Sequence, residues 1–102
     1  MDNEKIVLLA RLKVKKETVE DFTKTVLSLV ELSRAEPGCL NYDVHQAIDD
    51  DAIFVWHETW KNKAALDEHF AMPYFTEFFV KVGEIAEESP QVTLTKMLSA
   101  KV

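Results

Sequence analysis

One acidic side chain, that of Glu58, stands among aromatic residues in a segment that alternates like a β-strand. It is two residues from Trp56 and two from Trp60, so a strand places all three side chains on one face. A carboxylate buried beside indole rings needs hydrogen-bond donors, or its pKa rises until it stays neutral. Glu58 is therefore either a structural carboxylate bonded to a neighbouring donor or an acid–base group in a pocket.

A second strand is expected opposite this segment. The β-favouring runs 39–47 and 52–60 are separated by Ile48-Asp49-Asp50-Asp51, a short acidic connection typical of a hairpin turn. A turn centred on the aspartates gives facing residues numbers that sum to about 100, which places Tyr42 nearly opposite Glu58. The even-numbered side chains then share one face, and they are Leu40, Tyr42, Val44, Phe54, Trp56, Glu58 and Trp60.

The odd-numbered face of this hairpin mixes polar and β-branched side chains. Its members are Asn41, Asp43, His45, Ile53, Val55, His57 and Thr59. Because this face is too apolar to be left simply to water, it suits contact with a second sheet, and we expect a homodimer that packs through sheet faces. His45 and His57 are not directly opposed and no third ligand is implied, so no metal site is expected.

Two helical regions complete the pattern. Residues 16–34 repeat apolar side chains at three- and four-residue spacing and stop at Glu36-Pro37-Gly38, where proline cannot continue a helix and glycine permits a sharp turn. A second helix starts at the cap Asn62, runs to residue 70, breaks at Pro73 and resumes over 74–85. This helix carries His69. A lone helical histidine is most simply a core or boundary residue, but here the sheet would present Glu58 and Trp60 beneath the helix, so His69 is also a candidate site residue.

A first strand over 6–14 and a last strand over 91–99 give the order β-α-β-β-α-β. This order predicts an α+β, ferredoxin-like fold with an antiparallel sheet, in one domain that spans residues 1–102. Helices on one face leave the other face to solvent or to a partner.

The composition argues against several partners. A formal net charge of −6 provides no concentrated basic face for nucleic acid or anionic lipid. The first apolar run ends at Arg11 and is too short for a signal peptide or a membrane span. The single cysteine, Cys39, cannot form an intramolecular disulfide, which favours a reducing compartment, and we expect a cytoplasmic protein.

Three segments together resemble the antibiotic biosynthesis monooxygenase domain family and its small quinol-monooxygenase-like members. They are Glu36-Pro37-Gly38-Cys39-Leu40-x-Tyr42, Phe54-x-x-x-Glu58-x-Trp60 and Ala65-x-x-x-His69-Phe70-x-x-Pro73-x-Phe75-x-x-Phe78. The resemblance covers nearly the whole chain. It implies a dimeric α/β barrel with one cavity per subunit, and oxidation of phenols or quinols by O2 without flavin, haem or metal.

The resemblance also implies roles for individual residues. Glu58, His69 and Trp60 match residues of the family pattern, whereas Tyr74 stands where many members have a second histidine. Phe79 and Ala10 occupy the places of the haem ligands used by a haem-degrading branch, so no haem is expected.

Three functions follow from these features. The first is a monooxygenase that acts on a quinol or polyphenol, with Glu58, His69 and Tyr74 handling protons. The substrate contacts expected for it are Tyr42, Phe54, Trp56, Trp60 and Phe75. The second is an isomerase or lyase of a small metabolite in the same pocket. The third is a dimeric binding or stress-response module without turnover.

Overall fold

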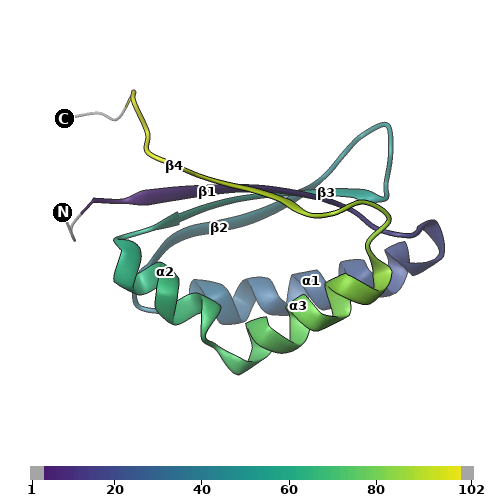
Figure 1. Ribbon diagram of the computed structural model, residues 1–102, viewed down its shortest axis with the longest axis horizontal. Coiled ribbons are helices and arrows are strands. Elements are labelled where there is room, and N and C mark those ends of the chain that lie inside the picture. Colours follow the sequence, from purple (N-terminus) through teal and green to yellow (C-terminus); the bar gives the residue numbers. More distant parts are fainter. Residues whose placement is uncertain (1–3, 100–102) are drawn as a thin grey trace.

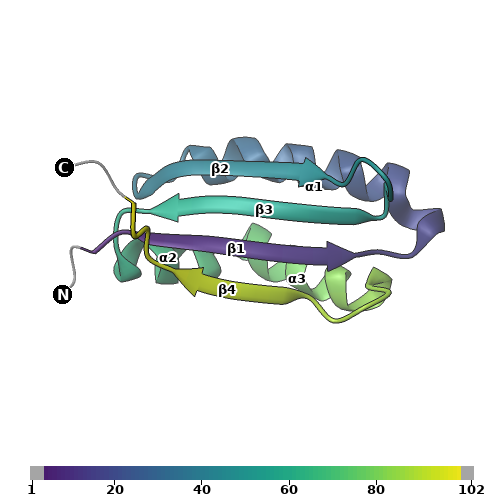
Figure 2. The same cartoon turned by 90° about the horizontal axis from the view of Figure 1, so that it is seen from above.

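One antiparallel sheet with helices on a single face forms the computed structural model, which describes residues 4–99 (Figure 1). The strand order is β2-β3-β1-β4 (Figure 2). The elements are β1 (Ile6–Lys13), a 3-10 turn (Lys16–Thr18), α1 (Val19–Arg34), β2 (Cys39–Gln46), β3 (Ile53–Trp60), α2 (Lys63–Phe70), α3 (Pro73–Ile85) and β4 (Gln91–Thr95). The predicted ferredoxin-like α+β fold is confirmed.

The pairing of β2 with β3 follows the expected register. Tyr42 lies opposite Glu58 and Val44 opposite Trp56, so the paired numbers sum to 100. The prediction for Leu40 is wrong, because a bulge between Cys39 and Asn41 displaces it from the alternation and leaves its side chain 51% exposed.

The core lies between the sheet and the helices. The even-numbered residues Leu8 and Leu12 of β1 are 3% exposed, and Phe22 of α1 is 1% exposed. The Phe22 ring meets the Phe54 ring of β3 edge-on, with centroids 5.0 Å apart. Each such buried side chain stabilises the fold by about 1.5–3 kcal/mol relative to its exposed state.

The helix boundaries have local causes. Asn62 caps α2, because its side-chain oxygen accepts a hydrogen bond from Ala65 N at 2.9 Å. Pro73 is the first residue of α3, where its missing N–H costs nothing, and so it restarts the helical path after α2. Gly38 has no positive φ. Glycine is required at this position because α2 lies close to the turn, and a Cβ on residue 38 would overlap the Cβ of Ala65.

The last strand is shorter than predicted. Its ladder with β1 ends where Thr95 pairs with Val7, one residue from the start of β1, so residues 96–99 find no strand partner. It is also an edge strand, and the side chains of Val92 and Leu94 are each 55% exposed.

The sheet face that α1, α2 and α3 leave bare is called the open face here; Leu9, Arg11, Asn41, Val55 and His57 are among its residues. Figure 2 looks onto it, with the helices behind the strands. Leu9, near the centre of the open face, is 43% exposed. Within residues 4–99, no helix is long and apolar enough to cross a membrane.

The close approach at Gly38 predicts a stability difference between two glycines. Gly38→Ala forces the turn or α2 to move and should lower the free energy of unfolding by about 1–3 kcal/mol. Gly83→Ala is the matched control, because nothing lies within 4 Å of the added Cβ, and alanine should raise stability by about 0.5–1 kcal/mol in α3. Urea denaturation measures both, and equal effects would contradict the packing argument.

Candidate active site

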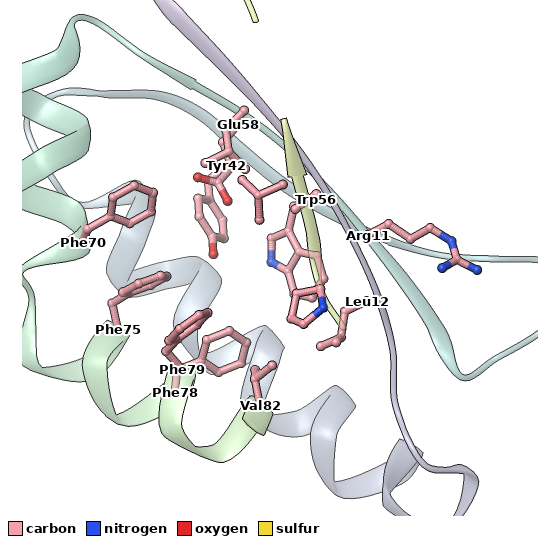
Figure 3. Close-up of a pocket in the computed structure, with 14 residues that line it drawn as sticks. Arg11, Leu12, Tyr42, Trp56, Glu58, Phe70, Phe75, Phe78, Phe79 and Val82 are labelled. Carbon is pink, nitrogen blue, oxygen red and sulfur yellow. The ribbon is translucent and has the colours of Figure 1, made fainter. Parts of the chain in front are cut away.

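A cavity of about 310 Å³ lies between the sheet and the two helices α2 and α3 (Figure 3). From the sheet it is lined by Leu8, Ala10, Leu12, Tyr42, Trp56 and Glu58, and from the helices by Phe70, Phe75, Phe78, Phe79 and Val82. Arg11, Pro90 and Val92 complete the lining. The volume is at the small end of the range for ligand sites, about 300–1,000 Å³.

Glu58 is the acidic group of this cavity. Its side chain is 5% exposed, and Oε1 accepts a hydrogen bond from Trp60 Nε1 at 2.9 Å. Burial raises the pKa of Glu58 from 4.5 to about 7, against the opposing effect of the Trp60 hydrogen bond and with a small further rise from Glu36. A carboxyl group with this pKa can both accept and return a proton near neutral pH.

Tyr42 is the strand neighbour of Glu58 and carries a hydroxyl group. The two residues pair across β2 and β3, and both side chains point toward the cavity (Figure 3). Burial, and then the Glu58 carboxylate, raise the pKa of Tyr42 well above its ordinary value. Tyr42 therefore keeps its proton at working pH and acts as a hydrogen-bond donor rather than as a base.

A second polar cluster lies outside the cavity lining. Glu36, in the turn after α1, is 9% exposed, and its Oε2 lies 2.8 Å from Nδ1 of His69. The Tyr74 hydroxyl donates to the same oxygen. Burial, and then the hydrogen bond to Glu36, raise the pKa of Tyr74 well above its ordinary value. The cluster joins α1 to α2 and α3.

The residues expected from the sequence fall into three groups. Tyr42, Trp56, Glu58 and Phe75 line the cavity. His69 and Tyr74 meet at Glu36. Phe54 and Trp60, which are 2% and 0% exposed, lie in the core outside the lining, so neither is placed to stack on a ligand. Trp60 instead holds Glu58 through its indole N–H.

Glu36 is the residue that sequence reasoning missed. The Glu-Pro-Gly segment explains a helix end, and nothing in that explanation requires the glutamate to be buried. One signal was present in the sequence: Glu36 lies between the end of α1 and the start of β2, the strand that carries Tyr42.

The charge of the cavity restricts its ligands. Arg11 is the one cationic residue in the lining, and its guanidinium group points away from the cavity (Figure 3). That group pairs with Glu88 at 3.1 Å, and Lys13 on the same strand pairs with Asp50 at 3.4 Å. A phosphorylated or carboxylated ligand would therefore meet Glu58 without a compensating cation. Among the described residues, no group of three or more His, Cys, Asp or Glu side chains could hold a metal ion.

Comparison with known proteins adds the family. The model of the family described as "Antibiotic biosynthesis monooxygenase" matches residues 5–81. The chain belongs to the antibiotic biosynthesis monooxygenase family. The match spans β1 to α3 and includes both the cavity carboxyl Glu58 and the Glu36 cluster.

Individual relatives agree with this assignment to the antibiotic biosynthesis monooxygenase family. The chain is 36% identical to the uncharacterized Synechocystis protein sll1783 over 90% of its own length and 63% of that protein. It is 37% identical to the Bacillus subtilis protein named "Putative monooxygenase YcnE", over 90% of this chain and 97% of that one. A crystal structure of an antibiotic biosynthesis monooxygenase superposes with a TM-score of 0.87 at 30% identity, covering 91% of this chain and 98% of that chain.

The raised pKa of Glu58 predicts how stability varies with pH. Between pH 4.5 and about 7 the folded protein holds a proton that the unfolded chain releases, so the free energy of unfolding falls as pH rises through this window. Above it, no further change comes from Glu58. Glu58→Gln removes this pH dependence and keeps an acceptor for the Trp60 indole. The free energy of unfolding of Glu58→Gln should therefore rise, relative to that of the unmodified protein, by on the order of 3 kcal/mol between pH 4.5 and about 7.

Urea denaturation at several pH values measures this gain. Glu84→Gln, a change at an exposed position of α3, is the control and should follow the unmodified protein. Parallel pH curves for Glu58→Gln and the unmodified protein would show that Glu58 is not a buried carboxyl with a raised pKa.

Proposed function

We propose that this protein is a monooxygenase that oxidises a quinol or polyphenol-type aromatic substrate with O2 and without flavin, haem or metal. The single observation that carries the proposal is a carboxyl group of pKa about 7 inside an aromatic cavity, where no cation offsets it. Membership of the antibiotic biosynthesis monooxygenase family supports the reaction class.

The chemistry needs a base and a dry, aromatic site. Glu58 accepts a proton from one substrate hydroxyl, which leaves an electron-rich phenolate able to reduce O2. A carbon–oxygen bond forms at a ring carbon that bears a hydrogen, and Glu58 returns its proton to the outer oxygen to give a hydroperoxide. The O–O bond then breaks, and the outer oxygen leaves as water with that proton and the hydrogen of the ring carbon. The electrons come from the quinol itself, which becomes a hydroxyquinone.

The cavity walls orient the substrate. Trp56 and Phe75 offer aromatic faces on opposite sides of the space, and the Tyr42 hydroxyl is available as a donor to a substrate bound there. The volume of about 310 Å³ favours substrates of one or two rings over larger polycyclic ones. His69 and Tyr74 lie outside the lining, where both contact Glu36, and they supply further proton-handling groups.

Oxygen uptake by the metal-free protein with a panel of quinols and anthrones tests the proposal. Glu58→Gln should lower kcat by about 100-fold or more, because an amide cannot accept the substrate proton. Glu84→Gln should leave kcat unchanged.

Absence of uptake with every substrate, or an unchanged kcat for Glu58→Gln, would contradict the proposal. Saturable binding of the quinols without turnover would favour a binding module. Conversion of a small metabolite without oxygen uptake would favour an isomerase or lyase.

We also propose that the protein is a homodimer packed through its open face. Leu9 and Val55 lie on this face, and Asn41 Nδ2 bridges Asp43 Oδ2 at 3.0 Å and the His57 carbonyl at 2.9 Å. Bonds of this kind satisfy polar groups that a second sheet would remove from water.

Sedimentation at micromolar concentration tests the dimer. Leu9→Glu should yield a monomer, because it adds a charge at the centre of the covered face. Leu27→Glu is the control, since Leu27 is 60% exposed on α1, on the helical side of the molecule. A monomer for the unmodified protein would contradict the proposal.

A further inference from the structure

The buried group formed by Glu36, His69 and Tyr74 is not explained by the chemistry at Glu58. One carboxylate oxygen, Oε2 of Glu36, accepts from the Tyr74 hydroxyl and lies 2.8 Å from Nδ1 of His69. The His69 side chain is 1% exposed and that of Glu36 is 8% exposed. Because buried polar groups have no water to bond with, the donor and the acceptor in each of these contacts must be complementary.

The contact with Glu36 determines where His69 carries its proton. A carboxylate has no hydrogen to give, so Nδ1 of His69 must be the donor in the contact with Oε2. In a neutral imidazole, Nε2 is then a bare acceptor. Within the described part of the chain, Nε2 is fully buried and has no hydrogen-bond partner.

The imidazole of His69 lies among aromatic rings, namely that of Trp60, whose centroid is 4.5 Å away, and three rings that belong to the cavity wall. The centroid of the imidazole is 5.1 Å from that of Phe75 and 5.8 Å from those of Tyr42 and Phe70. All three of these residues line the cavity. These wall rings lie between the imidazole and the substrate space, so proton transfer to Nε2 requires one of them to move, and Phe70, which is 38% exposed, is the most exposed of the three.

We propose that Glu36 is a positioning residue that fixes His69 in the Nδ1–H tautomer and so makes Nε2 the second proton acceptor of the site, a role that rests on the proposed monooxygenase function. Glu58 takes the proton of one substrate hydroxyl and His69 takes that of the other. The imidazolium formed is balanced by the Glu36 carboxylate. The proton on Glu58 returns to the departing water, whose second hydrogen comes from the oxidised ring carbon, and the proton on His69 returns to the hydroxyl of the product.

A purely structural role for Glu36 would have a different signature. The same contacts tie α1 to α2 and α3, so loss of the carboxylate lowers stability in either case. The tautomer of His69 also depends on this contact in either case, and only a positioning role lowers kcat while KM stays nearly constant.

Nitrogen NMR of the imidazole rings in the substrate-free protein tests the tautomer. His69 should show a protonated Nδ1 and a bare Nε2, unlike the exposed His45. Glu36→Gln keeps an acceptor oxygen and should retain this pattern, whereas Glu36→Leu should release Nδ1 and bring in the Nε2–H form. Glu31→Gln, at an exposed position of α1, is the control. An Nε2–H tautomer in the unmodified protein would overturn the proposal.

Oxygen uptake supplies the second test. Glu36→Gln should lower kcat by about 10-fold or more with little change in KM, because the charge that balances the imidazolium is lost. If Glu36→Leu fails to fold, the kcat of Glu36→Gln alone tests the positioning role. An unchanged kcat for Glu36→Gln, beside a reduced kcat for Glu58→Gln, would overturn the proposal and leave the proposed function intact. If no quinol is oxidised, the proposed function fails and the tautomer spectra decide the position of the proton on His69.

Discussion

The antiparallel pairing of β2 with β3 determines which side chains reach the cavity and which reach the open face. Side chains alternate with a period of two, so a slip of one residue would exchange the two sets completely. Glu58 and Trp56 would then face outward, and His57 would enter the core. The acidic turn at residues 48–51 and the aromatic residues at even positions hold the register that places Tyr42 opposite Glu58.

Burial of Glu58 opposes the stability that the surrounding aromatic residues provide. Its carboxyl group receives one hydrogen bond from the described protein groups, that of the Trp60 indole, and this bond does not offset the loss of hydration, since the pKa remains raised. A leucine of similar size would suit this apolar cavity better. Such a local conflict between burial and charge is expected at a functional site, and here it lies in the lining of the aromatic cavity.

Local rules were enough to predict much of this arrangement from the sequence. Asn62 acts as a cap, Pro73 restarts a helix and Glu58 faces Tyr42, because capping, proline geometry and strand alternation depend only on neighbouring residues. The bulge at Leu40 and the early end of β4 were not predictable, since they depend on how far the partner strand extends. The place of Trp60 was also missed. A periodic pattern assigns it to a face but cannot say whether that part of the face lines a cavity or fills the core.

Tertiary contacts between distant segments decide the rest of the site. Glu36 and His69 are 33 residues apart, and no local pattern indicates that the turn after α1 meets α2. The two carboxyl groups of the site are nonetheless coupled, because the charge of Glu36 contributes to the raised pKa of Glu58. Both are held in aromatic surroundings, with Trp60 bonded to one and its ring 4.5 Å from the imidazole that contacts the other.

Infrared or carbon NMR titration of the Glu58 carboxyl group, identified by its loss in Glu58→Gln, measures the pKa on which the proposed acid–base role depends. This carboxyl group should titrate near pH 7, well above the ordinary glutamate value of 4.5. Titration near pH 4.5 would mean that Glu58 is a solvated or fully paired carboxylate and not the acid–base group of an aromatic cavity.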